Sequence, residues 1–410
     1  MTATVSGERL PLLRLLVLSG AIFVSVSSEF LPTGLLPDIA ADLGVSESRV
    51  GLLVSLFAFT VALTAAPLTL LTRRMSRKWL LVGLLGVFAV SNVLAALAPT
   101  YELLGAARVV GGLAHGLFWA VATPYTALLV APGQLARAIS VTTAGGSFAF
   151  ILGVPFTAAI GHAIGWRAAF VVMAALVVVF TVLALVVLPA IDHRTARPPK
   201  VQTITTATGS IRDVRDRSIW AVGIVGVTVL LIATGHNLFY TYIAPWTIGV
   251  AGVSDDLVSL VLLFYGVAGA VGLLIAGVFG DRYPRLVLNV LAGGVVVLML
   301  VVGLGARGLL LAILLLSLWS VAFGGLPSLF HTRALHSASA RVRDLSGAVI
   351  TTAFNLAIGG GALLGGLVYD GLGVETVPYV GALVVAIGLL WTLLTDRRRI
   401  RLHPADAHLG

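Results

Sequence analysis

One acidic side chain lies deep within a long apolar stretch near the start of the chain. Glu29 falls within the run 12–40, with Ser25 four residues before it and Thr33 four residues after it. On a helix these three side chains form one polar stripe. An ionised carboxyl within hydrocarbon costs at least about 2.5–3.5 kcal/mol. We therefore expect the stripe to face a wet cavity or a partner rather than lipid, and Glu29 to alternate between protonated and ionised forms.

A second apolar stretch carries three polar or aromatic side chains on one face. Arg108, His115 and Trp119 are separated by seven and then four residues, which places them on one side of a helix. Histidine changes charge near neutral pH, whereas arginine stays charged. We expect Glu29, His115 and Arg108 to handle protons together, with Arg108 as an electrostatic anchor. The alternatives are a permanent Glu29–Arg108 ion pair and a neutral His115 with a structural role.

Uncharged polar and aromatic residues dominate the second half of the chain. Tyr240 follows His236, and Thr241 follows Asn237, each at a spacing of four, which gives neutral hydrogen-bonding groups on one helix. Aromatic rings stack on sugar faces and on drug rings, although a single ring is more often a packing residue. The residues that we predict to contact a solute are Trp119, His236, Asn237, Tyr240, Trp319, Phe323 and Asn355.

Several kinds of chemistry lack the residues that they need. The chain contains no cysteine, which excludes disulfides, thiolate metal sites and cysteine nucleophiles. It has no G-x-x-x-x-G-K-[ST] loop, no zinc-ligand spacing and no Ser/His/Asp pattern in a motif context. We therefore expect no metal, no cofactor and no enzymatic activity. A membrane-embedded enzyme that acts on lipid is the alternative from another functional class.

The composition is typical of a membrane protein. Hydrophobic residues make up 59% of the 410 residues and charged residues 10%, and the mean hydropathy is +1.06. A helix needs roughly 20 apolar residues to cross about 30 Å of hydrocarbon. Twelve stretches reach this length: 12–40, 50–71, 79–98, 101–130, 138–160, 168–188, 219–250, 257–279, 286–304, 309–335, 345–368 and 377–394.

The net charge of +9 indicates an orientation in the membrane rather than a nucleic-acid partner, because the basic residues crowd the gaps between stretches. Successive gaps lie on opposite sides of the membrane. Only Arg49, Arg167 and Arg307 fall in the gaps on the outer side, and Arg108 alone lies within a stretch. The positive-inside rule then predicts a multi-pass plasma-membrane protein with both termini in the cytoplasm. We expect a bacterial inner membrane, and a first stretch that is a span rather than a cleaved signal peptide.

The two halves of the chain repeat one another. At an offset of 208 residues Pro37 aligns with Pro245, Arg74 with Arg282 and Arg77 with Arg285, without a gap. The sequence therefore predicts an all-α integral membrane protein with twelve transmembrane helices in two pseudo-symmetric six-helix bundles, which rock about a central site. The predicted domains are an N-terminal bundle (1–189), a cytoplasmic linker (190–217), a C-terminal bundle (218–396) and a cytoplasmic tail (397–410).

Short motifs occur in order along nearly the whole chain. They are Ser28-Glu29-Phe30, Gly34 to Ala40, Arg108 to Gly112, His115-Gly116, Leu152 to Pro155, Gly165-Trp166-Arg167, Gly235-His236, Tyr240 to Ile243, and Gly277 to Arg285. This series resembles the twelve-helix drug:proton antiporters of the major facilitator superfamily, in particular the sugar-efflux and chloramphenicol-exporter branch. The resemblance implies a titrating acid at Glu29 and a functional histidine at His115. The segment 145–155 resembles a degenerate form of the antiporter motif of the fifth helix.

The loop 277–285 resembles the cytoplasmic gate motif of the same superfamily. The resemblance implies that Asp281, Arg282 and Arg285, together with Arg74, lock the helices of an outward-facing state by charge pairing. In the first-half copy Arg73 stands where the family has an acid. A plain positive-inside role for these arginines is the alternative.

Together these features predict a proton-coupled exporter that moves a small, neutral or weakly polar solute by alternating access. A proton symporter that imports a nutrient is the runner-up, and the choice between a sugar and a drug stays open. The expected partners are a small-molecule substrate, protons and the lipid bilayer, with no nucleic acid, and we expect a monomer.

Overall fold

The computed structural model describes residues 10–72, 74–190, 216, 218–305, 307–339 and 342–402, and these residues contain helices but no strand. Twelve of its helical segments are long and apolar enough to cross a membrane, in the order of the twelve predicted stretches. Arg73, nearly all of the predicted linker 190–217 and the end of the predicted tail 397–410 lie outside the described residues.

The first half forms eight α-helices, because two of its predicted spans are each interrupted once. Pro32 lies near the end of the first helix and leaves a gap in its hydrogen bonding. A five-residue π-helical segment, η2 (Ala149–Gly153), precedes Pro155 in the fifth span. The helices are α1 (Leu12–Gly34), α2 (Leu36–Leu43), α3 (Glu47–Leu71), α4 (Arg77–Ala96), α5 (Tyr101–Leu128), α6 (Leu135–Phe148), α7 (Val154–Ile164) and α8 (Trp166–Val187), with a 3-10 turn η1 (Pro132–Gln134) before α6.

The second half has the same succession of six spans, but its second interruption divides the tenth span, the counterpart of α5, and leaves the eleventh unbroken. Its elements are α9 (Ser218–Tyr240), α10 (Ile243–Gly249), α11 (Asp255–Phe279), α12 (Pro284–Gly303), α13 (Leu309–Gly324), α14 (Leu326–Ser337), α15 (Arg343–Leu372), the 3-10 turn η3 (Val374–Thr376) and α16 (Val377–Leu402). Gly44 (φ 62°) caps the short helix α2, Gly252 (φ 68°) follows the short helix α10, and the 208-residue offset relates the two glycines. The same offset relates Gly165 (φ 95°) to Gly373 (φ 87°), which confirms the predicted duplication in the backbone.

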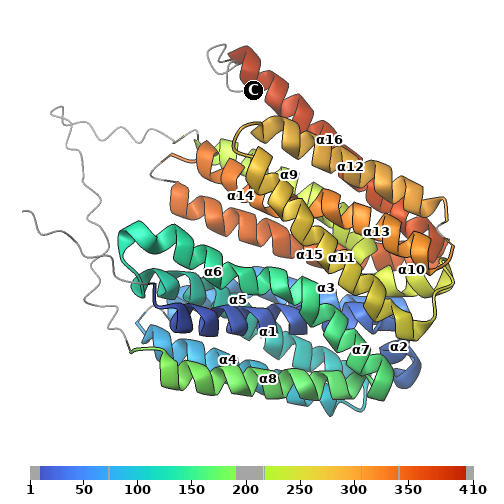
Figure 1. Cartoon of the computed structure of the whole chain (residues 1–410), viewed down its shortest axis with the longest axis horizontal. Helices are drawn as coiled ribbons and strands as arrows, with labels where there is room; N and C mark the ends of the chain where they lie inside the picture. Colours follow the sequence, from blue (N-terminus) through green and yellow to red (C-terminus); the bar gives the residue numbers. More distant parts are fainter. Residues whose placement is uncertain are drawn as a thin grey trace, which may run out of the picture.

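The two halves form two helical bundles that lie side by side (Figure 1). In the first bundle α1 packs on α6 and α8, while α5 packs on α3 and α4; in the second, α9 packs on α15 and α16. Helices α3 and α15 form the largest contact between the bundles, and α7 meets α11. We call the end that carries α2 and α10 the outer end, following the predicted orientation, and the opposite end the inner end.

Glycines bring the fifth span against α1. A Cβ atom on Gly145 would lie 1.9 Å from the backbone oxygen of Ser19, and one on Gly153 would lie 1.8 Å from the hydroxyl oxygen of Ser27. Only glycine fits at these distances. The residues that resemble the antiporter motif therefore have a packing role, which fixes α1 and its polar stripe.

Hydrogen bonds join the bundles at the outer end. Ser48 donates from its hydroxyl to Asp370 Oδ2 at 2.7 Å, and the Tyr369 hydroxyl donates to Glu47 Oε2 at 2.9 Å. Deeper in the molecule Ser55 donates to the backbone oxygen of Gly359 at 2.8 Å. These are the three hydrogen bonds between the bundles within the described part of the chain. We call Glu47, Ser48, Tyr369 and Asp370 the outer latch, which closes the outer end in this structure.

Candidate functional site

The predicted polar stripe of α1 is buried at the centre of the first bundle. Ser25, Glu29 and Thr33 are 2%, 5% and 0% exposed, so none of the three faces lipid. Ser28 also faces inward and donates to Asn92 Oδ1 on α4 at 2.7 Å. The stripe therefore contacts protein on several sides, which is one of the two surroundings that the sequence predicted, and it does not face lipid.

Arg108 contacts the main chain of α1 and not the Glu29 carboxyl. Its Nη1 donates to the Ser28 carbonyl at 2.8 Å and its Nη2 to the Glu29 carbonyl at 2.6 Å. In a regular helix the Ser28 carbonyl accepts from the amide four residues later, which is Pro32 and has no N–H. Arg108 supplies the missing donor. Its guanidinium carbon also lies 4.3 Å from the ring centre of Phe57.

Glu29 instead contacts His115. Glu29 Oε2 lies 3.4 Å from His115 Nε2, and both side chains are buried. Ser25 Oγ lies 2.8 Å from His115 Nδ1, and Trp119 donates from Nε1 to His115 Nε2 at 2.9 Å. The three predicted proton-handling residues thus lie together, with Arg108 bound to the backbone next to the Glu29–His115 contact. We call Ser25, Glu29, Arg108, His115 and Trp119 the Glu29–His115 cluster.

The second bundle holds an aromatic cluster of His236, Tyr240, Tyr265, Trp319 and Phe323. The His236 ring is stacked between Phe323, with ring centres 3.3 Å apart, and Tyr240, with ring centres 5.7 Å apart. The Tyr265 hydroxyl lies 3.3 Å from His236 Nε2. Within the described part of the chain, His236 Nδ1 and Trp319 Nε1 are buried and lack a hydrogen-bond partner. Each can therefore bind a polar group of a solute or a water molecule.

The repeat relates this aromatic cluster to the Glu29–His115 cluster. At the offset of 208 residues Phe323 takes the place of His115, Tyr265 that of Phe57, and Asn237 that of Glu29. Phe57 lies edge-on to His115 at 5.3 Å between ring centres. One fold position is therefore titratable in the first bundle and uncharged in the second.

The remaining predicted solute residues are less closely grouped. Asn237 is buried and donates to the Ala233 carbonyl at 2.8 Å. Asn355 on α15 donates to the Thr351 carbonyl at 3.0 Å and is only partly buried. Each amide thus spends one donor on its own helix and keeps its side-chain oxygen as an acceptor. The structure thus brings together four of the predicted solute residues, and no described contact joins Asn355 to them. The four are His236, Tyr240, Trp319 and Phe323.

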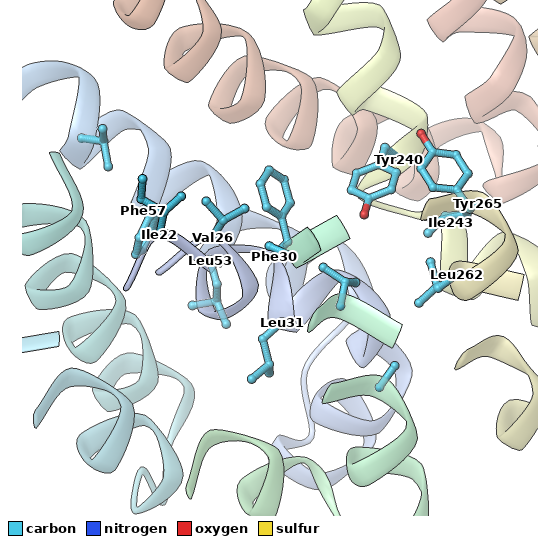
Figure 2. Packing of buried hydrophobic residues seen from close by; sticks show 14 of the residues in the cluster. Ile22, Val26, Phe30, Leu31, Leu53, Phe57, Tyr240, Ile243, Leu262 and Tyr265 are labelled. Carbon is cyan, nitrogen blue, oxygen red and sulfur yellow. The ribbon is translucent and has the colours of Figure 1, made fainter. Parts of the chain in front are cut away.

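Phe30 links the two clusters across the bundle interface. It follows Glu29 directly, and its ring centre lies 5.9 Å from that of Tyr240 and 4.9 Å from that of Phe150. Figure 2 shows Phe30 of the first bundle pointing toward Tyr240 of the second. The sequence analysis named Phe30 only as part of a motif and did not predict this contact. Two features could have indicated it: Phe30 directly follows Glu29, and its side chain is a large apolar ring.

The predicted gate residues lie at the inner end and are not paired. Asp281, Arg282 and Arg74 are exposed, and Arg285 is partly buried. No ion pair involves Asp281 within the described part of the chain. The closed outer latch and the unpaired gate loop are together the arrangement expected of an inward-facing transporter.

Comparisons with known proteins give the chain a family. The model of the Major Facilitator Superfamily matches residues 18–362. A protein of Mannheimia succiniciproducens named probable sugar efflux transporter is 31% identical over 392 residues, which are 94% of each chain.

Solved structures share the fold. A bacterial homologue of the human lysosomal transporter Spinster, in an inward-facing and unoccupied conformation, matches with a TM-score of 0.73 at 15% identity over 96% of this chain and 98% of that one. The nucleoside transporter NupG matches with a TM-score of 0.73 at 15% identity over 94% of this chain and 99% of that one. With its two bundles of six spans, the duplicated backbone and the family match, this chain belongs to the major facilitator superfamily of multi-pass membrane transporters.

Proposed function

We propose that the protein exports a small neutral solute in exchange for protons, by alternating access between the two bundles. The observation that carries the proposal is the buried contact between the Glu29 carboxyl and the His115 imidazole at 3.4 Å. A carboxyl and an imidazole in contact can pass a proton between them, and neither has another ionic partner in the described part of the chain. Arg108 is held by two carbonyls and keeps its charge, so it serves as a fixed positive neighbour.

The driving force is sufficient for uphill export. One proton that crosses about 100 mV supplies roughly 2.3 kcal/mol, and each pH unit adds about 1.4 kcal/mol. Glu29 binds a proton when the site opens to an acidic exterior and releases it when the site opens to the cytoplasm. Solute then occupies the inward-facing site only after the proton has left, which couples the two movements.

The aromatic cluster supports a neutral solute that carries hydrogen-bonding oxygens. The cluster is built from aromatic rings, which include Tyr240 and Trp319, and the Trp319 N–H, which has no described partner, needs an acceptor. The described residues of this cluster include no acid or arginine that would bind an ionic solute. The relative named as a probable sugar efflux transporter favours a sugar over an aromatic drug, and it favours export over import.

Transport in inside-out membrane vesicles tests the proposal. The vesicle interior is acidified, labelled sugars are added outside, and a pH dye follows proton release. We expect wild-type vesicles to accumulate sugar and release protons, whereas Glu29→Gln, which resembles the protonated carboxyl, loses accumulation but keeps solute counterflow. Glu102→Gln is the matched control, because Glu102 is an exposed acid whose side chain is 74% accessible.

Two results would overturn the proposal. Accumulation by Glu29→Gln at the wild-type rate would place the proton carrier elsewhere. Accumulation only in right-side-out vesicles would instead identify the runner-up, a proton symporter that imports its solute.

A further inference from the structure

The hydrogen bond from Trp119 fixes the protonation pattern of the His115 ring. An indole N–H can only donate, so the nitrogen that it contacts at 2.9 Å, His115 Nε2, must accept. A neutral imidazole has one donor and one acceptor nitrogen, so the hydrogen lies on Nδ1. His115 Nδ1 then donates to Ser25 Oγ at 2.8 Å. His115 is therefore neutral in this structure.

The acceptor nitrogen of His115, Nε2, also faces the Glu29 carboxyl. Glu29 Oε2 lies 3.4 Å from His115 Nε2, the nitrogen whose lone pair already accepts from Trp119. An ionised carboxylate would point its own lone pairs at that nitrogen, which is repulsive, whereas a protonated carboxyl can donate toward it. The geometry therefore fits a proton on Glu29. A transfer of that proton to His115 Nε2 requires Trp119 to move its N–H away.

No other charged group competes at this ring. The described contacts of His115 are with Ser25 and Glu29 on α1, Phe57 on α3 and Trp119 on its own helix, with Arg108 two turns away. Helix α4 contributes only apolar side chains, which are Leu84, Leu85 and Phe88. The proton affinity of His115 thus depends on Glu29, Arg108 and the Trp119 hydrogen bond.

We propose that Trp119 is a positioning residue for the proton step, which acts on His115 rather than on the solute. Its N–H occupies His115 Nε2 in the inward-facing state and keeps the shared proton on Glu29, from which it leaves to the cytoplasm. The proposal rests on the proposed proton coupling for its transport consequence. Its hydrogen-bonding part concerns the ring alone and is tested separately.

Nitrogen NMR of the histidine ring tests the hydrogen-bonding part. Trp119 is replaced by benzothienylalanine, which keeps the shape of the indole but has sulfur in place of N–H, and the His115 signal is assigned by its loss in His115→Asn. We expect hydrogen on Nδ1 in the wild type, and a shift toward hydrogen on Nε2 in the variant. The same replacement at Trp246 is the matched control, because Trp246 is buried and its Nε1 has no described partner. If the replacement at position 119 leaves the His115 tautomer unchanged, the proposal is overturned.

The pH dependence of export tests the transport part. Without the Trp119 N–H, His115 Nε2 is free to hold the proton, so release to the cytoplasm needs a higher pH. A neutral hydrogen bond contributes about 0.5–1.5 kcal/mol, and about 1.4 kcal/mol corresponds to one pH unit. We expect the midpoint on the cytoplasmic side to rise by about 0.5–1 pH unit with an unchanged KM for the solute, and no effect of the replacement in a His115→Asn background.

A raised KM with an unchanged pH midpoint would identify Trp119 as a solute contact and overturn the proposal. If the wild type shows no proton-driven export at all, the proposed function fails. The NMR measurement still decides whether the Trp119 N–H determines which nitrogen of His115 carries hydrogen.

Discussion

Pro32 and Arg108 complement each other at the centre of the first bundle. Proline leaves the Ser28 carbonyl without its helical donor, and the guanidinium of Arg108 donates to that carbonyl and to the next one. A planar fork with several donors can bind two carbonyls at once, whereas a lysine ammonium is a single point charge. The charge of Arg108 is thereby placed at a fixed distance from the titratable pair.

We expect Arg108→Lys to destabilise the protein and to slow export. Hydrogen bonds that involve a charged group contribute about 1.5–3 kcal/mol, which corresponds to a melting temperature lower by about 2–4 °C for a chain of this size. In a Pro32→Ala background the new amide satisfies the Ser28 carbonyl, so the effect of Arg108→Lys should shrink. Thermal unfolding of the four proteins in detergent measures this coupling. Strictly additive losses would contradict the complementary roles of Pro32 and Arg108.

The sequence predicted which residues meet in this cluster but not how they bind. Glu29, Arg108 and His115 stand out because charged side chains are rare within apolar spans. The acceptor of Arg108 depends on the depth at which α5 packs against α1, and the partner of His115 Nε2 depends on the Trp119 rotamer. Neither the packing depth of α5 nor the Trp119 rotamer can be predicted from residue spacing. The signal that was available, and unused, is that Pro32 lies four residues after Ser28.

Helices α3 and α15 close the outer end through the four residues of the outer latch. Each bundle donates one hydroxyl to a carboxylate of the other, at 2.7 and 2.9 Å. The predicted eleventh span ended before Tyr369 and Asp370, so no sequence pattern paired them with α3. Contacts between bundles depend on the conformational state, which a repeat or a hydropathy pattern does not encode.

We expect Tyr369→Phe to open the outer end. Loss of a hydrogen bond of about 1 kcal/mol shifts a two-state population about fivefold. Because the chain has no cysteine, Ala41→Cys and Ser254→Cys give a clean pair of spin-label sites, one on each bundle at the outer end. The distance distribution should gain a longer component in Tyr369→Phe and not in Tyr379→Phe, a matched control whose hydroxyl makes no described hydrogen bond. Equal distributions in all three proteins would show that the latch does not hold the outer end closed.

A charged contact fastens α2 to α8. Arg167 donates to Asp42 Oδ2, and Trp166 Nε1 donates to the same oxygen at 3.2 Å. The Arg167 hydrogen bond, and to a smaller extent that of Trp166, lowers the pKa of Asp42 below its usual value, against a smaller opposing effect of burial. Arg167 also donates to the Ala98 carbonyl at 3.1 Å, which ties the end of α4 to the same point.

We expect Asp42→Asn to lower the melting temperature at neutral pH by about 1 °C or less, because partly exposed ion pairs contribute at most about 1 kcal/mol. A carboxyl with a lowered pKa in the folded state stabilises the protein above its unfolded pKa of about 3.9, and the stabilisation disappears as the pH falls through the folded value. The difference in melting temperature between the wild type and Asp42→Asn should therefore be constant above about pH 5, roughly one unit above that reference value, and should shrink in more acidic buffer. A difference that grows toward low pH would contradict this assignment.

Across the whole molecule, duplication gave two bundles with the same backbone and different chemistry. The positions of Glu29, Arg108 and His115 correspond to Asn237, Leu316 and Phe323 at the 208-residue offset. The first bundle therefore carries the titratable groups and the second carries aromatic and amide groups. Phe30 and Tyr240, in contact at 5.9 Å between ring centres, join the two sites where the bundles meet. The residue that directly follows Glu29 thus contacts the aromatic cluster.

The outer latch is closed in this structure, so the predicted gate around Asp281 would act in the opposite, outward-facing state. Asp281 is exposed and forms no ion pair with any residue that the structure describes, although Arg282 and Arg285 are close to it in sequence, so no described contact uses its charge in this arrangement. A gate that pairs Asp281 with arginines when the bundles close at the inner end would stabilise only the outward-facing state. Its removal should then shift the population toward the inward-facing state.

We expect Asp281→Asn to shorten the lifetime of the outward-facing state without changing the inward-facing one. Spin labels are placed at Ala131→Cys and Leu335→Cys, one on each bundle at the inner end. The Tyr369→Phe protein should show a short-distance component, because its outer latch is weakened, and adding Asp281→Asn should remove that component. Asp256→Asn is the matched control, because Asp256 is an exposed aspartate at the other end of the same helix, α11. If an exposed charge of about 0–1 kcal/mol is all that Asp281 contributes, the two substitutions will give the same distances, and the arginines of this loop then serve only to orient the protein in the membrane.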